Sequence, residues 1–194
     1  MQKTIENLAK AFIGESQARN RYSYYAKIAQ QEGYEQIGAI FLETADQEKQ
    51  HAKKWFETFQ DLKKKGGQDL SAITVEAEAP TAYSTTIENL KAAIAGETFE
   101  HVTMYPGFAD VADSEGLKEI ADRMRAVASA EAHHHERYQK LLDQLEAGTV
   151  FKKDEEVSWV CRECGFVHVG KEAPKVCPSC DHAQAFYQIK CENY

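Results

Sequence analysis

The chain has 194 residues, with 31 acidic and 23 basic side chains, so its formal net charge at pH 7 is −8. This acidic balance argues against nucleic acid or an anionic membrane surface as a partner, because both attract positively charged proteins. No apolar run approaches the roughly 20 residues of a membrane span and no signal-peptide pattern is visible, so we expect a cytoplasmic protein.

Apolar residues in the first part of the chain, about 150 positions, recur at alternating spacings of three and four, which predicts amphipathic helices that pack as a bundle. Four such segments can be distinguished: Ile5–Tyr25, Ile37–Leu62, Ile87–Val111 and Leu117–Leu145. A glutamate stands in the middle of the apolar stripe of each segment. In the second and fourth segments a histidine follows it one turn later.

Turn signals separate these helices. Gly33 and Gly116 are expected to end the first and third helices, and Ser114 to cap the N-terminus of the fourth. Pro106 should kink or interrupt the third helix. Residues 66–85 form a stretch that is long for a helix connection. We expect it to cross the bundle or to pass to a partner chain.

The two halves of the helical region repeat each other. The matching segments are 4–8 with 86–90 (Thr-Ile-Glu-Asn-Leu), 14–15 with 96–97 (Gly-Glu), and 48–51 with 131–134 (Glu-x-x-His), the last with its offset changed by one residue. The repeat is broken at Glu100, which stands where the first half has Ala18. The second half therefore carries one additional carboxylate, a turn beyond Glu97.

The repeated carboxylates and imidazoles predict a site for two metals: Glu48 with His51, Glu131 with His134, and the single residues Glu15 and Glu97. Residues three apart share a helix face, and di-iron carboxylate proteins use this ligand arrangement inside four-helix bundles. Burying so many ionisable groups without a cation would be very costly. Carboxylate and imidazole suit iron or manganese, although zinc also accepts them. We expect Glu48 and Glu131 to bridge the metals, with Glu15 and Glu97 as terminal ligands on opposite sides.

Other polar residues lie close to this pattern. Tyr22 and Tyr105 lie one to two turns from Glu15 and Glu100. They could pack in the core or donate hydrogen bonds to the metal carboxylates. The remaining histidines of this region lack the ligand spacing, so we expect them beside the metals or in solvent: His101, His133 and His135.

Four cysteines form two Cys-x-x-Cys pairs separated by 12 residues: Cys161 with Cys164, and Cys177 with Cys180. This pattern predicts a tetrahedral thiolate site that holds either structural zinc or redox-active iron. A segment of under about 40 residues would need a metal to fold, because its apolar core is too small. Cys191 is expected to remain outside the site.

On these residues the chain resembles the rubrerythrin family along nearly its whole length. The motifs that carry the resemblance are Glu15, Glu48-x-x-His51, Gly96-Glu97-x-x-Glu100, Glu131-x-x-His134, and Cys161-x-x-Cys164 with Cys177-Pro178-x-Cys180. The resemblance implies a mainly α fold in three parts. These are a ferritin-like four-helix bundle at residues 1–148, a linker at 149–157, and a small rubredoxin-like β/loop domain with bound metal at 158–194.

The resemblance also implies a function: a non-haem di-iron peroxidase that reduces hydrogen peroxide to water and protects against oxidative stress. Its cofactors would be two irons in the bundle and one iron in an Fe(Cys)4 site that relays electrons. The electron donor would be external, either rubredoxin or an NAD(P)H-dependent reductase, which makes the peroxidase NADH-linked. Family members are usually homodimers, often with electrons passing from the Fe(Cys)4 iron of one subunit to the di-iron site of the other.

Within the site, the resemblance implies that Glu100 and His51 are alternative ligands of one iron, exchanged as its oxidation state changes. We therefore take Glu100, His51, Tyr22 and Tyr105 as candidate catalytic residues. One departure from the family is visible. Rubredoxin-type metal-binding turns usually end in glycine, but Asp181 stands at the second of these positions. Aspartate tolerates a left-handed backbone better than most residues, so we expect the fold to survive.

Two other functions use the same residues. A ferritin-like ferroxidase or iron store needs the same bundle, but it also needs a large cage and has no use for a redox tail. Alternatively, a zinc ribbon attached to a bundle could act as an interaction module without catalysis. Glu100 and the two cysteine pairs favour the peroxidase over the ferroxidase.

Overall fold

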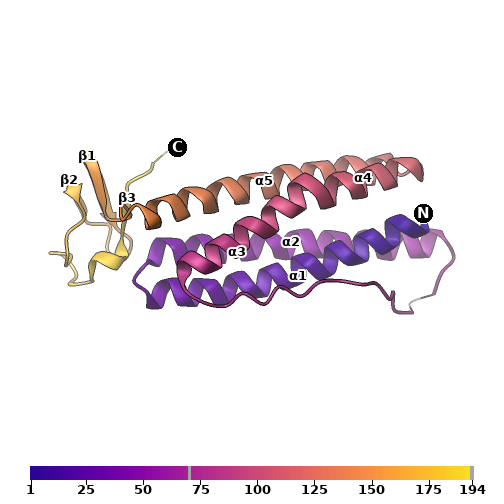
Figure 1. The fold of residues 1–194 in the computed structure, drawn as a ribbon, viewed down its shortest axis with the longest axis horizontal. Coiled ribbons are helices and arrows are strands. Elements are labelled where there is room, and N and C mark those ends of the chain that lie inside the picture. The colour runs from indigo at the N-terminus through magenta and orange to yellow at the C-terminus, as the bar shows by residue number, and fades with distance from the viewer. Residues whose placement is uncertain (70, 193–194) are drawn as a thin grey trace.

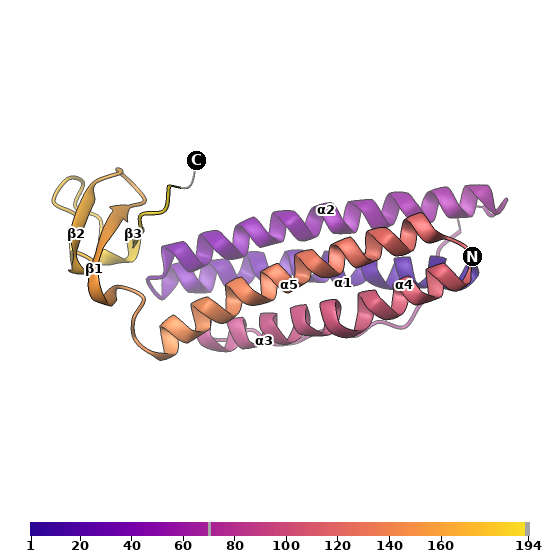
Figure 2. The same cartoon turned by 90° about the horizontal axis from the view of Figure 1, so that it is seen from above.

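The computed structural model describes residues 1–69 and 71–192. Figure 1 shows an elongated helical bundle with a small β-domain at one end, which confirms the mainly α fold. The helices form four rods. The first, second and fourth rods are the single helices α1 (Gln2–Gln31), α2 (Glu35–Lys65) and α5 (Lys118–Glu146). The third rod consists of three consecutive elements: α3 (Thr86–Phe99), the π-helix η1 (Glu100–Met104) and α4 (Tyr105–Ser114). Helix α1 packs on α2, and α5 packs on the third rod (Figure 2).

Each rod ends at a glycine with a positive φ: Gly33, Gly67, Gly116 and Gly148. Glycine adopts this left-handed conformation at little cost because it has no Cβ. The first and third rods close with equivalent backbone hydrogen bonds, from Tyr34 N to Ala29 O and from Leu117 N to Ala112 O, both 2.8 Å long. In the described part of the chain, no helix combines the length and the apolar character that crossing a membrane requires.

The predicted N-cap of the fourth helix was wrong. Ser114 is the last residue of α4, and its hydroxyl donates a hydrogen bond of 2.7 Å to the carbonyl of Val111. Helix α5 starts only after Leu117. The turn around Gly116 extends to Leu117, whose N–H closes the preceding helix by bonding to the carbonyl of Ala112. Helix α5 therefore starts too far along the chain for Ser114 to cap it.

Two glutamates cap the starts of α1 and α3 from the opposite half of the bundle. Glu115 accepts hydrogen bonds from the backbone N–H groups of Lys3 and Thr4, at 3.3 and 2.9 Å. Glu32 accepts a hydrogen bond of 3.0 Å from the N–H of Thr86. Both glutamates directly precede a helix-ending glycine, and Thr4 and Thr86 are equivalent in the repeat. Each half of the bundle therefore satisfies backbone donors that the other half leaves without an intrahelical partner.

The π-helix accounts for the change in offset between the repeats. The offset is 82 residues between Glu15 and Glu97, but 83 between Tyr22 and Tyr105. One residue has therefore been added between Glu97 and Tyr105, where η1 lies. A π-turn accommodates one extra residue inside an otherwise continuous helix. The interruption expected near Pro106 thus lies just before that proline, which occupies the first turn of α4.

Two buried apolar clusters lie on either side of the middle of the bundle. The cluster nearer the β-domain includes Tyr22, Phe41, Leu90 and Tyr138. The other cluster includes Leu8, Trp55, Tyr105 and Met124. Several members are equivalent in the repeat, such as Tyr22 with Tyr105 and Trp55 with Tyr138. The glutamates of the predicted metal site lie along each helix between the two clusters.

The C-terminal β-domain is a three-stranded antiparallel sheet with the order β2-β1-β3. Its strands are β1 (Lys152–Cys161), β2 (Val167–Glu172) and β3 (Tyr187–Ile189), with a short 3-10 turn, η2 (Gln184–Phe186), before β3. Residues 152–157, which were expected to belong to a linker, form the first part of β1. The expected domain also includes residues 193–194, which lie outside the described residues.

The β-domain packs against the turn between α1 and α2. The rings of Tyr34 and Phe151 stack with centroids 6.2 Å apart and planes at 8°. A Cβ at Gly33 would lie 3.8 Å from the Cβ of Ala185. These contacts place the cysteine pairs at one end of the bundle.

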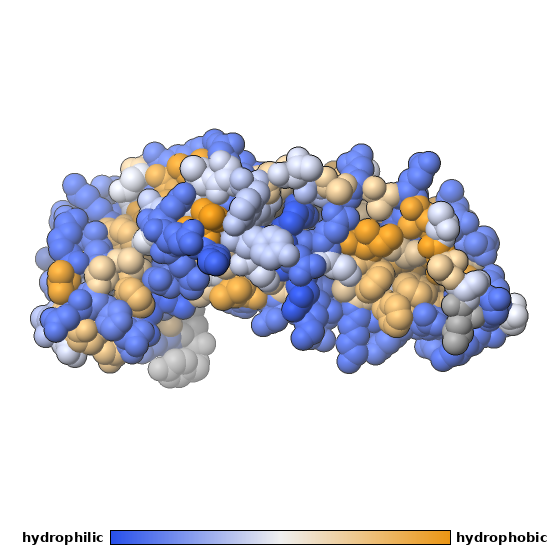
Figure 3. All heavy atoms as spheres, turned by 90° about the horizontal axis from the view of Figure 1, so that it is seen from below, coloured by the Kyte–Doolittle hydropathy of each residue, from blue (hydrophilic) through white to orange (hydrophobic). Residues whose placement is uncertain are grey.

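The long connection between α2 and α3 runs along the outside of the bundle, beside α1 and the third rod (Figure 1). Gln17 Nε2 donates a hydrogen bond of 2.9 Å to the carbonyl of Glu78, and the hydroxyl of Tyr25 donates one of 2.7 Å to the carbonyl of Ala82. Within this chain the connection follows the outside of the bundle from one end to the other. Residue 70 lies outside the described residues. The face that carries the connection shows apolar patches between charged side chains (Figure 3).

Replacing Glu115 with Gln should destabilise the bundle by about 1 kcal/mol at pH 7, because the substitution weakens the cap of α1. Burial tends to raise the pKa of this carboxyl. Hydrogen bonds from the N-terminal ammonium, Thr4 and Lys3 outweigh burial and lower the pKa to about 2. The carboxylate therefore contributes stability above its unfolded pKa of about 4.5, and this contribution is lost as the pH falls through about 2. Urea denaturation of both proteins between pH 7 and 2 measures the difference.

The matched control for this prediction is Asp46→Asn, which changes an exposed carboxylate of α2. It should leave the urea midpoint within the range of ordinary surface substitutions, about 0.5 kcal/mol. Equal effects of the two substitutions, or a difference that grows toward low pH, would contradict the proposed cap.

Candidate metal centres

The four rods bring the predicted glutamates and histidines together in the middle of the bundle. They form two groups of four whose ligand atoms all lie within 4.8 Å of one another: Glu15, Glu48, His51 and Glu131 in one group, and Glu48, Glu97, Glu131 and His134 in the other. Glu48 and Glu131 belong to both groups. If two metals are bound, Glu48 and Glu131 would be the residues that reach both, with Glu15 and His51 on one side and Glu97 and His134 on the other.

The donor atoms of this cluster fit a pair of cations. Five buried carboxylate oxygens and one ring nitrogen have no hydrogen-bond partner within the described residues: Glu15 Oε2, Glu48 Oε1, Glu97 Oε2, both oxygens of Glu131, and His134 Nδ1. Leaving buried polar atoms unpaired is costly. His134 Nδ1 lies 2.8 Å from Glu131 Oε2 and 3.1 Å from Glu48 Oε1. Cations between these atoms would satisfy all of them, and carboxylate with imidazole is a ligand set that suits iron.

Without a cation, the carboxylates of the site compete for protons. Burial, together with the charges of Glu48 and Glu131, raises the pKa of Glu15 well above its usual value. Burial is also the main reason that the pKa of Glu97 rises to about 8. Burial would raise the pKa of Glu48 as well, but close contacts with the imidazoles of His134 and His51 outweigh it and lower that pKa to about 2. The site therefore holds carboxylic acid and carboxylate side by side.

The two histidines of the site are protonated at neutral pH when no cation is bound. Burial tends to lower the pKa of each imidazole, but close contacts with the carboxylates of Glu131 and Glu48 outweigh it. The pKa rises to about 9 for His51 and to about 12 for His134. A metal must displace these protons before it can bind the ring nitrogens.

Neighbouring side chains hold the candidate ligands in place. His134 Nε2 donates a hydrogen bond of 3.0 Å to Gln47 Oε1, which directs Nδ1 at the site. The hydroxyl of Tyr22 donates a hydrogen bond of 2.5 Å to Glu97 Oε1, and the hydroxyl of Tyr105 donates one to Glu15 Oε1. Both phenols have a pKa well above the usual value, first because of burial and then because of these carboxylates, so they remain donors.

The hydrogen-bonding interpretation of Tyr22 and Tyr105 is therefore confirmed, and the pairs cross between the two halves of the bundle. Sequence reasoning missed Gln47, and it also missed Trp55, whose Nε1 donates a hydrogen bond of 2.8 Å to the Tyr105 hydroxyl. No spacing rule marks these residues, because each contacts a residue on a different helix.

Glu100 is the first residue of η1 and is 8% exposed, but it belongs to neither group of four. Burial raises its pKa well above the usual value, and the nearby charges of Glu97, Glu131 and Glu48 raise it further. His51, rather than Glu100, completes the group around Glu15. Glu100 is therefore a carboxyl group held close to the cluster without being part of it.

The other histidines lie beside the cluster or at the surface, as expected. Nδ1 of His101 lies 2.7 Å from the carbonyl oxygen of Glu97 and can donate a hydrogen bond to it. The rings of His101 and His135 are 5.4 Å apart, and His133 is exposed. None of the three belongs to a group of potential metal ligands within the described residues.

The four paired cysteines form the third group of candidate ligands, with their sulfur atoms all within 4.8 Å of one another. Cys161 and Cys180 are 3.8 Å apart, and Cys164 and Cys177 are 3.6 Å apart. Cys191 lies outside this group. Four thiolates in this arrangement suit either iron or zinc.

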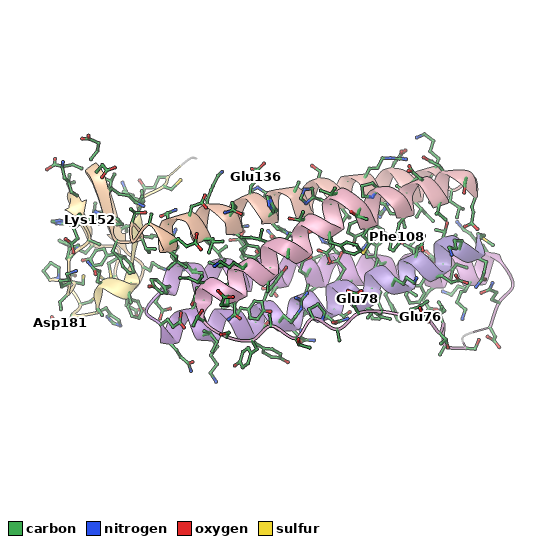
Figure 4. The ribbon with its side chains drawn as sticks, in the orientation of Figure 1. Glu76, Glu78, Phe108, Glu136, Lys152 and Asp181 are labelled. Atoms are coloured by element: carbon green, nitrogen blue, oxygen red, sulfur yellow. The ribbon has the colours of Figure 1, made fainter. Side chains whose placement is uncertain are left out.

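Asp181 adopts the left-handed conformation that its position requires, with φ of 61°, beside 77° for Gly165 at the equivalent position. The N–H of Asp181 donates to the carbonyl of Cys177, and the N–H of Gly165 donates to that of Cys161, both at 2.9 Å. The expectation that the turn tolerates aspartate is therefore confirmed. Asp181 lies at the edge of the β-domain farthest from the bundle (Figure 4).

Comparison with known proteins gives a consistent result. Residues 6–142 match the family model described as Rubrerythrin, and residues 159–188 match the model described as Rubrerythrin, rubredoxin-like domain. A protein of Methanocaldococcus jannaschii is 60% identical over 195 residues, which covers 100% of this chain and 96% of the relative. The rubrerythrin of Porphyromonas gingivalis is 47% identical over 193 residues, covering 99% and 92%. The structure of fully reduced, all-ferrous nigerythrin is similar with a TM-score of 0.62 and 30% identity, covering 96% and 86% of the two chains.

Loading the bundle site with metal at pH 7 should release at least two protons, because His51 and His134 carry protons there when no cation is bound. A pH-indicator dye in weakly buffered solution measures this release when Zn²⁺ is added to metal-free protein. Metal affinity should accordingly fall as the pH is lowered.

The double variant Glu48→Ala/Glu131→Ala serves as the control, because it removes both shared carboxylates and keeps the four cysteines. The difference in proton release between wild type and this variant reports the bundle site alone. Equal release from both proteins would show that the histidines do not exchange protons for metal.

Proposed function

Because this chain belongs to the rubrerythrin family, whose members are iron-dependent oxidoreductases, we propose that it reduces hydrogen peroxide to water in the cytoplasm as protection against oxidative stress. One observation carries this proposal: a two-metal ligand set and a four-thiolate site occur in one chain, with an additional buried carboxyl, Glu100, beside the first. An iron store would need neither the thiolates nor the additional carboxyl.

Reduction of one hydrogen peroxide molecule takes two electrons and two protons and yields two water molecules. An iron pair held by the Glu/His cluster would supply both electrons, and an iron held by the four cysteines would replace them one at a time. Glu100 is a buried carboxyl group beside the cluster, so it is placed to hand a proton to the departing oxygen. Tyr22 and Tyr105 hold Glu97 and Glu15 in position through their hydrogen bonds.

His51 and Glu100 would exchange as ligands of one iron during turnover. The geometry supports this proposal because His51 belongs to the group around Glu15, whereas Glu100 lies just outside it. The π-helix supports it as well, since Glu100 stands where the regular helical hydrogen bonding changes. Such a point gives its side chain an orientation that a continuous α-helix would not.

The position of the β-domain favours a homodimer as the working form. The cysteine cluster lies at the α1–α2 turn, while Glu15 stands 16 residues before the end of α1, a separation of roughly 24 Å along the helix. A second chain in head-to-tail orientation would bring the cysteine cluster of one subunit to the di-iron site of the other. The external donor would be rubredoxin or an NAD(P)H-dependent reductase.

The first test follows the Fe(Cys)4 absorbance after rapid mixing. Protein that has been fully reduced without oxygen should regain its red colour quickly with a small excess of hydrogen peroxide, and more slowly with oxygen. Cys177→Ser should lose the visible band but keep a single oxidation of the iron pair. A protein that is colourless, or that recovers its colour slowly with both oxidants, would favour a zinc ribbon or a ferroxidase, and a cage-sized assembly would favour iron storage.

A second test replaces Glu100 with Ala. This variant should still bind two irons in the bundle, but its turnover of hydrogen peroxide should fall roughly 100-fold, the usual effect of losing a positioned proton donor. Glu136→Ala is the matched control, because Glu136 is exposed on the outer face of α5 (Figure 4). Wild-type turnover in Glu100→Ala would remove Glu100 from the mechanism.

A further inference from the structure

A cavity of about 340 Å³ lies between α1, the third rod and the long connection, and Glu100 is part of its lining. Met104 and Phe99 of the third rod, together with Ala77 and Pro80 of the connection, contribute apolar walls. Figure 4 shows Glu76 and Glu78 along the connection on this side of the bundle. One water molecule takes up about 30 Å³ of liquid. The cavity is therefore several times larger than the two oxygen atoms of hydrogen peroxide require.

Two glycines keep this cavity open as far as Glu100. A Cβ at Gly14 would lie 3.9 Å from Glu100 Oε1, and a Cβ at Gly96 would meet no atom within 4 Å. The two glycines are equivalent in the repeat, and both line the cavity. A molecule in the cavity can therefore reach the carboxyl group of Glu100.

The outer wall of the cavity is held to the bundle. The hydrogen bond from Gln17 Nε2 to the carbonyl of Glu78 joins the connection to α1 beside the cavity. Farther along, the Tyr25 hydroxyl holds the carbonyl of Ala82. These bonds fix the connection at the distance from α1 that leaves the cavity open.

The lining is mostly apolar, and its charges do not favour an anion. Lys10 and Arg21 are its cationic residues, whereas Glu76, Glu78 and Glu100 are acidic. An anionic ligand would therefore gain little from the charges of the cavity. A neutral molecule with an apolar body and one small polar end matches the lining best.

We propose that this cavity binds the organic part of neutral alkyl or aryl hydroperoxides, with the –OOH group directed at Glu100, and that these compounds are substrates in addition to hydrogen peroxide. This inference rests on the proposed peroxidase function. In the reaction, ROOH takes up two electrons and two protons to give ROH and H2O. The O–O bond breaks, each oxygen gains a proton, and the two electrons come from the same reduced iron pair.

The first experiment measures binding without turnover. The probe is 2-phenyl-2-propanol, the alcohol formed when cumene hydroperoxide is reduced, and the protein is loaded with zinc. Saturation-transfer NMR should detect binding of the alcohol to the wild type. A methyl spectrum of protein labelled with ¹³C at methionine should show a shift of the Met104 signal when the alcohol is added. Gly96→Leu should weaken binding about tenfold or more, because the new side chain occupies the cavity. Gly107→Leu is the matched control, since Gly107 is also helical with open space around it but lies outside the cavity.

The second experiment compares oxidants on iron-loaded, fully reduced protein. Cumene hydroperoxide should oxidise the wild type, and Gly96→Leu should slow this reaction about tenfold or more relative to the reaction with hydrogen peroxide. If Gly96→Leu does not bind two metals, Ala77→Trp narrows the same cavity from the exposed connection and takes its place. Absence of alcohol binding, or an equal loss with both oxidants, would overturn this inference. Failure with hydrogen peroxide in the wild type would instead overturn the proposed function, and the NMR experiment would still test the cavity.

Discussion

Five buried glutamates meet two histidines, the buried His134 and the half-buried His51, inside a helical bundle, and the rest of the structure depends on this arrangement. Apolar clusters lie on both sides of the site, so bulk water cannot satisfy the carboxylates. Protons meet part of the demand, as the raised pKa values of Glu15, Glu97 and Glu100 show. Several carboxylate oxygens still lack a partner within the described residues. A pair of cations satisfies them, so the bundle is organised around a metal site.

The internal repeat lets each half of the bundle support the other. Glu32 and Glu115 each cap a helix of the opposite half. Tyr22 donates a hydrogen bond to Glu97, and Tyr105 donates one to Glu15, so these bonds also join the two halves. This symmetry alone would make the two metal positions equivalent. Glu100 removes the equivalence, because the first half has Ala18 at the corresponding position, and η1, which begins at Glu100, adds a residue that the first half lacks.

The surroundings of Glu100 connect the site to the outside of the molecule. The long connection runs past it, and two glycines leave room between this connection and the carboxyl group. The cysteine cluster, in contrast, lies at the far end of the bundle against the α1–α2 turn. The cavity beside Glu100 and the cysteine cluster therefore lie in different parts of the same chain.

The sequence by itself determined the helical bundle, the repeat, the ligand set and the two cysteine pairs, because helical periodicity and fixed ligand spacings are local properties of a chain. It also marked Glu100 as the break in the repeat. Only the tertiary structure decided that the added residue forms a π-helix, that Gln47 orients His134, and that the charged segment after residue 151 becomes a strand. The start of α5 was missed for a local reason, because the turn around Gly116 uses the residues after Ser114 to close α4. The orientation of His134, the pairing of that strand and the course of the long connection depend instead on contacts between residues that are distant in the sequence, and no local pattern encodes such contacts.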